Sequence, residues 1–447
     1  RSLEAVERAR EGGGPTLIEC KTYRFCGSYA AEPLRVERLY RSEEEVLEWK
    51  KRDPIPRLER ILLESGIVRE EEISSIKEEI RRRVEEATDR ALKAPMPPKS
   101  LVYEHLYPEA PRGPEEPPEE CEVRELSMAE ALRETLREEM ERDDRIILMG
   151  EDIGILGGDF RVTKGLLEEF GEERVRDTPV SETGFMGIAV GAAMMGLKPI
   201  VEIMFIDFIG CCMDQVMNQA AKIPYMYAGQ VRLNIVIRAA CGGGIRAAAQ
   251  HSQVLGSIFS HIPGLKVVMP SNPRDARGLL KSALREGCPV LMLEHKLLYG
   301  VRGEVPMGEY YTPIGKARVV KEGSDITIVA SGFMVTKALE AASALEEEGI
   351  SSEVIDLRTL SPLDKETILS SVKKTGRLVV VDEDWGPCGI SSEVIALVAE
   401  EAFNYLKAPA KRVTPPFYPM PYSPPLEDSV IPDSEDIVSA VRELFPG

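Results

Sequence analysis

Residues 177–205 read DTPVSETGFMGIAVGAAMMGLKPIVEIMF, a helix-forming stretch followed by an apolar run. Glycine and alanine recur through 184–196, so we expect a helix whose small side chains allow close packing. The run at 200–205 is nearly all apolar, which is typical of a strand buried on both faces. This order indicates a parallel α/β sheet, in which ligand-binding residues follow the strands.

Similar apolar runs alternate with helical stretches along the rest of the chain. The first set lies at 145–150, 200–205, 233–239, 265–270 and 290–295. The second set lies at 325–331, 352–357 and 377–384. A stretch rich in glycine and proline, 303–315, separates the two sets. The fold class is therefore predicted to be α/β, with two stacked parallel-sheet domains at 124–308 and 309–447.

The first 107 residues offer less material for a core. A strand-like run at 12–25 begins with three glycines, and apolar residues from Ile73 to Ala91 recur at three- and four-residue spacing. The spacing predicts an amphipathic surface helix with one buried stripe. Residues 108–123, rich in proline and glutamate, are predicted to be an extended linker. Ser127 and Glu130 then predict a capping box at the start of the next helix.

Composition excludes several classes of protein. The formal net charge of −19 argues against a nucleic-acid surface, which needs clustered Lys and Arg. The longest apolar stretch, 185–197, is too short to span a membrane, so no membrane partner is expected. The eight cysteines form no CxxC pair or regular framework. Reduced thiols in the cytoplasm, or in an organelle matrix, are the expectation.

Glu182 is the first candidate for chemistry. In the simpler reading Ser181 caps the helix that follows and Glu182 complements its positive end. In the functional reading the carboxylate lies in a partly buried cleft and takes part in proton transfer. The position of Glu182 alone favours the simpler reading.

His251 is the second candidate, because it follows the Gly242–Gly244 loop after a predicted strand. A loop histidine can act as an acid–base group near neutral pH, but a backbone-bonded structural role is equally compatible with the position. The three glycines are compatible with close approach to a ligand or with a flexible lid. Walker-type, GxGxxG and metal-ligand spacings do not occur, so no metal is expected to be held by this chain alone.

Several long stretches together resemble one family. They are DTPVSETGFMGIAVGAAMMGLKPIVEIMF, MDQVMNQAAK, AAAQHSQ, HIPGLKVVMPSNPRDARGLL, LEHKLLYG and YSPPLEDSVIP. In order, from residue 124 to 447, they resemble the β subunit of the decarboxylating component of 2-oxo acid dehydrogenase complexes. The resemblance implies a transketolase-like pyrimidine-binding domain, a transketolase C-terminal-like domain and thiamine diphosphate as cofactor.

The resemblance also implies roles for individual residues. Glu182 stands where the family's glutamate exchanges a proton with the aminopyrimidine ring of the cofactor. Phe208 matches an aromatic residue that packs on the pyrimidine, and Val180 adjoins Glu182 in the same pocket wall. His251 matches a histidine that assists proton transfer when the acyl group passes to a lipoyl group.

Residues 1–107 resemble the C-terminal end of the family's α subunit, through ECKTYRF and YRSEEEVLEWKKRDPI. Two departures follow. No Gly-Asp-Gly motif, which binds Mg²⁺ and diphosphate in the α subunit, occurs in the sequence, and Ser28 stands where the family usually has a histidine. Because the Gly-Asp-Gly motif is absent, an α region, either upstream of Arg1 or on another chain, is expected to supply the Mg²⁺ site.

The enzyme reading is therefore the β part of an α/β active site in an α₂β₂-like assembly. It would oxidatively decarboxylate a 2-oxo acid and pass the acyl group to a lipoyl domain of the dihydrolipoyl acyltransferase core. The alternative is a non-catalytic module that docks on that core. A transketolase or synthase fits the QHSQ and LEHKLLYG runs less well. The sequence does not distinguish pyruvate, branched-chain 2-oxo acids and acetoin as substrates.

Overall fold

The computed structural model describes residues 1–25, 41–108 and 113–445. The chain divides into two compact units, Arg1–Pro98 and Lys99–Gly447. Because the two units are not placed relative to one another, each is described by itself. No helix in the described ranges is long and apolar enough to cross a membrane.

The first unit is helical, with α1 (Ser2–Arg10), α3 (Glu43–Lys50), α4 (Pro54–Glu64) and α5 (Glu70–Lys93). Stacked rings of Tyr23 and Trp49, 5.1 Å apart, and an ion pair of 2.7 Å between Lys77 and Glu59 hold its parts together. None of the four helices contains a buried residue. This unit therefore has the thin core that its sequence predicts.

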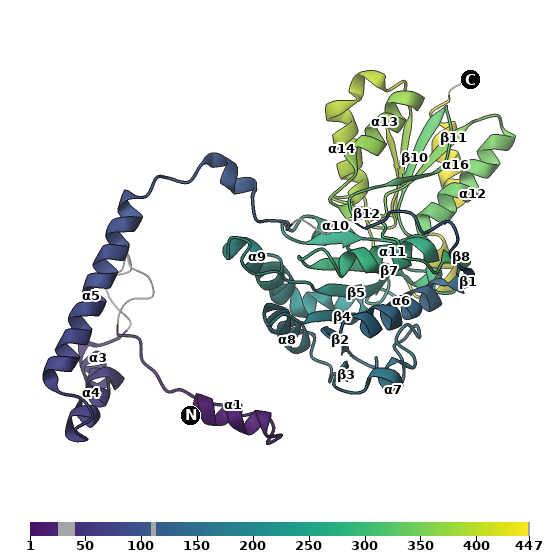
Figure 1. The fold of residues 1–447 in the computed structure, drawn as a ribbon. Helices are drawn as coiled ribbons and strands as arrows, with labels where there is room; N and C mark the ends of the chain where they lie inside the picture. The colour runs from purple at the N-terminus through teal and green to yellow at the C-terminus, as the bar shows by residue number, and fades with distance from the viewer. Residues whose placement is uncertain (26–40, 109–112, 446–447) are drawn as a thin grey trace. The chain divides into compact units, whose positions relative to one another are not determined.

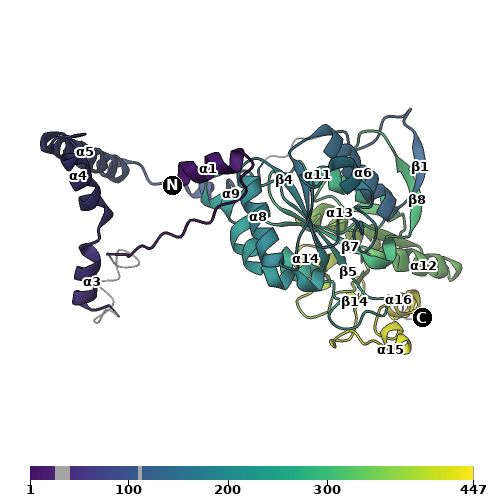
Figure 2. The same cartoon turned by 90° about the horizontal axis from the view of Figure 1, so that it is seen from below.

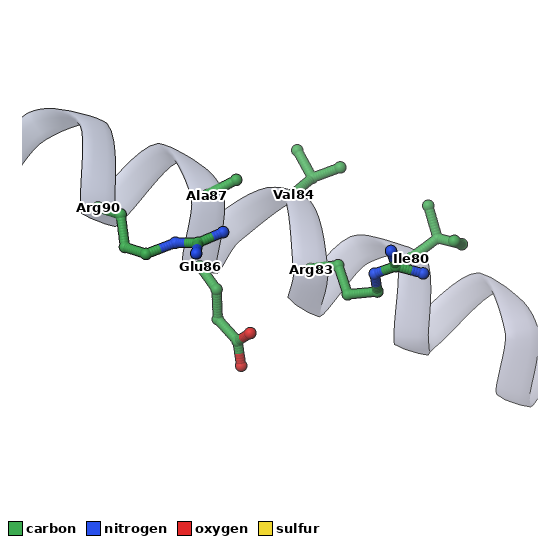
Figure 3. Close-up of a pocket in the computed structure, with 6 residues that line it drawn as sticks. All are labelled: Ile80, Arg83, Val84, Glu86, Ala87 and Arg90. Carbon is green, nitrogen blue, oxygen red and sulfur yellow. The ribbon is translucent and has the colours of Figure 1, made fainter.

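Two predictions for this unit are wrong. Residues 12–25 form no strand, because the described part of the unit offers no second strand with which they could pair. The predicted amphipathic helix is present as α5, but its apolar stripe is not buried within the unit. Ile80, Val84 and Ala87 project from one side of α5 and Glu86 from the other (Figure 3), and Ile80 and Val84 are each at least half exposed.

The second unit contains two large sheets (Figure 1). The first has seven strands in the order β12-β6-β7-β5-β4-β2-β3, all parallel except β12, which pairs antiparallel with β6. Its strands are β2 (Ile146–Gly150), β3 (Val175–Asp177), β4 (Lys198–Phe205), β5 (Val236–Cys241), β6 (Lys266–Val268), β7 (Val290–His295) and β12 (Thr359–Ser361). β1 (Val123–Ser127) and β8 (Arg302–Pro306) form a separate antiparallel pair.

The second sheet has five strands in the order β14-β13-β10-β11-β9, parallel except for the edge strand β9. Its strands are β9 (Arg318–Lys321), β10 (Ile326–Ala330), β11 (Ser352–Asp356), β13 (Leu378–Val381) and β14 (Lys411–Val413). The predicted α/β class with two parallel-rich sheets is thus confirmed. β12 lies in the sequence of the second domain but completes the sheet of the first.

Helices cover the sheets of the second unit. On the first sheet, α6 (Met128–Arg142) and α11 (Pro273–Ala283) pack together on one face, and α8 (Glu182–Met194) packs on the other (Figure 2). The remaining helices are α7 (Leu166–Phe170), α9 (Ile223–Met226), α10 (Gly256–Ser260), α12 (Phe333–Glu347), α13 (Lys365–Thr375), α14 (Ile390–Glu401), α15 (Pro424–Asp428) and α16 (Ser434–Arg442). Short helical turns are η1 (Lys99–Tyr103), η2 (Ile206–Cys212), η3 (Gln215–Ala220), η4 (Lys296–Leu298) and η5 (Phe403–Tyr405).

Alternate residues of the strands supply two apolar layers. In β2, Ile147 and Met149 join one buried cluster, whereas Ile146 and Leu148 join the cluster beneath α6 and α11. The first cluster continues into the second domain, where it includes Ile355 and Val380. The two domains therefore share one continuous core.

The predicted capping box at the start of α6 is confirmed. The Ser127 hydroxyl accepts from the Glu130 N–H at 3.2 Å, and the Glu130 carboxylate accepts from the Ser127 N–H at 2.8 Å. The described part of the predicted linker lies on the second unit, where the Tyr311 N–H donates to the Pro114 carbonyl at 2.8 Å. The domain limits predicted at 107/108, 123/124 and 308/309 remain predictions.

Asp356, at the end of β11, makes stability depend on pH. Its burial, assisted by the neighbouring Asp275, raises its pKa to about 7. An unfolded aspartate titrates near pH 4, so between about pH 4 and 7 the folded state holds a proton that the unfolded state releases. Stability should therefore fall as pH rises through this window, by up to about 1.4 kcal/mol per pH unit for this group.

Asp356→Asn should make the fall in unfolding midpoint between pH 4.5 and 7 shallower, as measured by urea titration at several pH values. Asp144→Asn is the control, since the Asp144 side chain is 100% exposed, and it should leave the wild-type profile unchanged. An Asp356→Asn profile as steep as that of the wild type would contradict the assignment.

Candidate active site

The predicted site residues follow neighbouring strands of the seven-stranded sheet. Because these strands are parallel, their carboxyl ends meet along one edge, where α/β proteins bind ligands. The residues that follow the five strands are Val180 and Glu182 after β3, Glu151 after β2, Phe208 after β4, His251 after β5 and Lys296 after β7.

Glu182 is the first residue of α8, as predicted, but Ser181 does not cap the helix with its side chain. The Ser181 hydroxyl instead donates to the Pro179 carbonyl at 2.9 Å, and the Ser181 N–H donates to the Glu151 carboxylate at 3.3 Å. The capping hypothesis was therefore wrong. Glu182 still lies in the first turn of α8, at the positive end of the helix.

Two other titratable groups, Glu151 and Cys212, lie near Glu182. Burial, together with the Glu182 charge, raises the pKa of Glu151. The same two causes raise the pKa of the Cys212 thiol to about 12. Cys212 ends η2, and the Thr183 hydroxyl donates to the Cys211 carbonyl in the same turn. The start of α8 is thus fastened to η2, the segment that holds Phe208.

Phe208 and His251 lie in direct contact. Their ring centroids are 5.2 Å apart at an interplanar angle of 89°, and Phe205 meets the His251 ring at 5.0 Å and 78°. These edge-to-face arrangements are favourable for aromatic rings. The fold therefore brings together two residues that lie after different strands.

Lys296 supports the His251 side of this cluster. Its ammonium group donates to the His251 carbonyl and lies 5.3 Å from the centre of the Phe205 ring. Burial lowers the pKa of Lys296. Sequence reasoning missed both Lys296 and Glu151, although each directly follows an apolar strand run. The rule that ligands bind after parallel strands contained the signal for both.

Val180 is placed differently from the other predicted residues. Its side chain is 82% exposed, so its predicted role in a pocket wall remains a prediction. Ser28 lies outside the described residues. In the parts of the chain that the structure describes, no group of three or more His, Cys, Asp or Glu side chains could hold a metal ion. The predicted lack of a metal in this chain stays untested.

Buried polar atoms without partners adjoin the predicted residues. They are Thr178 Oγ1, Asp207 Oδ2 and Ser252 Oγ, which neighbour Val180, Phe208 and His251 in the sequence. An unpaired buried polar atom is costly, so each of these three atoms calls for an explanation such as a bound water or ligand. The Phe208–His251 pair presents aromatic surfaces of the kind on which a planar ring such as a pyrimidine packs.

The architecture and this strand-edge site define a transketolase-like α/β protein. Residues 124–302 match the family model "Transketolase, pyrimidine binding domain" and residues 315–437 match "Transketolase, C-terminal domain". Residues 2–100 match "Dehydrogenase E1 component". A solved structure described as a split-gene transketolase, inactive β4 tetramer, shares 28% identity and a TM-score of 0.59, covering 72% of this chain and 98% of its own.

Curated relatives narrow the class further. The acetoin:2,6-dichlorophenolindophenol oxidoreductase β subunit of Cupriavidus necator is 51% identical over 73% of this chain and 99% of its own length. The pyruvate dehydrogenase E1 β subunit of Rickettsia bellii is 47% identical over 72% of this chain and 98% of its own length. The 2-oxoisovalerate dehydrogenase β subunit of Bacillus subtilis is 47% identical, over 71% and 98% respectively.

The chain belongs to the family of β subunits of 2-oxo acid dehydrogenase E1 components. Ahead of the β-type region it carries a tail of the α-subunit type, as its sequence predicts. The domain matches and the relatives support thiamine diphosphate as the cofactor of the E1 reaction.

The aromatic cluster can be tested by NMR. Phe208→Leu should shift the His251 Cε1–H resonance, because the ring that lies 5.2 Å away would no longer shield or deshield it. Histidine-selective labelling gives four signals, since the chain has four histidines. The exposed His261 should keep its position and serves as the internal control. A His251 signal that does not move would contradict the contact.

Proposed function

We propose that this chain forms the pyrimidine side of a thiamine diphosphate site shared with an α-type partner. The observation that carries the proposal is the joint placement of Glu182, Phe208 and His251 at one sheet edge. In the shared site, Glu182, Phe208 and Val180 would hold the pyrimidine. The diphosphate and Mg²⁺ would be held by the α-type half, which carries the Gly-Asp-Gly motif that this sequence lacks.

The chain's own residues have distinct tasks in this proposal. Bound thiamine diphosphate supplies the electron sink that allows carbon dioxide to leave the 2-oxo acid. The Glu182 carboxylate exchanges a proton with the pyrimidine ring nitrogen and fixes its tautomer. Phe208 excludes water from one face of the ring. His251 holds and delivers a proton as the acyl group passes to a lipoyl group.

The proposed partners follow from the sharing of the cofactor site between two parts. An α-type subunit or region completes the site, so we propose an α₂β₂-like assembly. The acyl acceptor is a lipoyl domain of a dihydrolipoyl acyltransferase core. The relatives named for acetoin, pyruvate and 2-oxoisovalerate have similar identities, 51% and 47%. The proposal therefore leaves open which of these small oxo compounds is the substrate.

Glu182→Gln should abolish decarboxylation in the enzyme assembled with its α-type partner, because the amide cannot give or take the proton. The loss should be at least about 100-fold, the usual size of a general acid–base contribution. Glu173→Gln is the matched control, since the Glu173 side chain is 92% exposed. Decarboxylation at the wild-type rate would refute the role of Glu182.

His251→Ala should reduce acyl transfer to a lipoyl domain much more than decarboxylation measured with an artificial electron acceptor. The exposed His261 provides the control, His261→Ala, which should change neither step. Equal losses in both steps would count against the role of His251. If neither His251→Ala nor Glu182→Gln changed either step, a non-catalytic module that docks on the acyltransferase core would become the better account.

A further inference from the structure

The loop that carries His251 is held in an unusual conformation. It runs from Gly242 to Gln253 and closes on itself, because the Gly242 N–H donates to the Gln253 carbonyl at 2.9 Å. Arg246 and Ala248 both have left-handed backbone angles, with φ of 62° and 60°. Such angles cost a non-glycine residue about 1 kcal/mol or more, so they persist only where surrounding contacts enforce them.

The three glycines at the start of this loop explain how the contacts are reached. A Cβ atom on Gly242 would collide with the His295 ring, one on Gly243 with Ile431, and one on Gly244 with Leu297. The glycines thus let the backbone approach protein side chains, one of them in the C-terminal domain. Neither close approach to a ligand nor a flexible lid is needed to account for them.

Glu427, in α15 of the C-terminal domain, binds the backbone of the loop. Its side chain is fully buried. One carboxylate oxygen accepts from the Gly244 N–H at 2.8 Å, and the other accepts from the Arg246 N–H at 3.1 Å and from the Arg246 guanidinium at 2.6 Å. A buried carboxylate needs such partners, and here the loop supplies them.

A second buried carboxylate of the C-terminal domain, Glu383, also binds the loop. Glu383 accepts from the Gly243 N–H at 2.7 Å, and its other oxygen pairs with the His295 ring at 2.7 Å. Three backbone N–H groups of the loop therefore donate hydrogen bonds to two buried carboxylates of the C-terminal domain. A more exposed carboxylate, Asp428, pairs with the Arg246 guanidinium at 2.6 Å, and its side chain is 62% exposed.

We propose that Glu427 is a positioning residue, through which the C-terminal domain fixes the loop that places His251 against Phe208. The inference rests on the proposed function of His251, which it deepens by naming the group that orders the histidine. Glu427 binds the first half of the loop, through Gly244 and Arg246. His251 lies in the second half, where Lys296 holds its carbonyl.

The test is Glu427→Gln in the full chain, which keeps the size of the side chain but places an amide N–H₂ against donors. Hydrogen–deuterium exchange of the 242–251 peptide should accelerate about 10-fold or more, as expected when buried hydrogen bonds to a charged acceptor are lost. The His251 Cε1–H resonance should shift or broaden. In the assembled enzyme, acyl transfer to a lipoyl domain should fall about 10-fold or more, because small misplacements of a reacting group are costly.

Asp428→Asn is the matched control, because it removes the exposed carboxylate from the same arginine and leaves the buried contacts intact. It should behave as the wild type in all three measurements. The proposal is overturned if Glu427→Gln leaves loop exchange and the His251 signal unchanged, or if Asp428→Asn changes them equally.

A second variant keeps the test decisive if Glu427→Gln does not fold. Arg246→Ala removes the partly exposed guanidinium and should give smaller changes in the same direction, with partial recovery in Arg246→Lys. Failure of the proposed function gives a different result. If His251 has no role in acyl transfer, His251→Ala leaves transfer intact, whereas hydrogen–deuterium exchange of the loop still shows whether Glu427 orders it. If His251→Ala impairs transfer and Glu427→Gln does not, the positioning role is wrong and the function of His251 stands.

Discussion

The buried guanidinium of Arg238 joins three central strands of the seven-stranded sheet through ion pairs. Arg238 in β5 is 2% exposed and donates to Glu294 in β7 at 2.8 and 2.6 Å and to Glu202 in β4 at 2.6 Å. Glu202 and Arg238 are register partners in their strands. A slip of one residue would turn these charges into the apolar layer on the opposite face, at a cost of several kcal/mol. The ion triad therefore favours the observed register of the three strands.

The ends of those strands determine the site. Phe208, His251 and Lys296 follow β4, β5 and β7, and Glu182 follows β3 two strands away from β4. A fixed register places these side chains at one edge without any direct link between them in the sequence. The final alignment is then made by short contacts, such as that of Lys296 with the His251 carbonyl. The rigid sheet sets the coarse geometry and the loops set the fine geometry.

The second domain takes part in the same construction. It contributes β12 to the first sheet, shares the apolar cluster that contains Ile355 and Val380, and binds the His251 loop through Glu383 and Glu427. The sequence alone predicts the central strands of both large sheets, because near-continuous apolar runs are a local signal, but it does not predict the β1–β8 pair or the short edge strands β9, β12 and β14. It also predicts Glu182, Phe208 and His251 through resemblance. It could not predict the contact of Arg246 with Glu427, because the two lie 181 positions apart and no local pattern joins them. Ser181 failed as a cap for a different reason, since its hydroxyl donates to the carbonyl of the nearby Pro179 and is not turned toward the helix.

In the proposed function, this chain holds only the pyrimidine side of a shared cofactor site. Titration calorimetry of the 447-residue chain with thiamine diphosphate and Mg²⁺ tests it most directly, first without and then with an α-type partner. The account predicts weak or absent binding to the chain by itself and tight, magnesium-dependent binding once the partner is added. Tight, magnesium-dependent binding to this chain without a partner would contradict it, because residues of this chain would then have to hold the diphosphate.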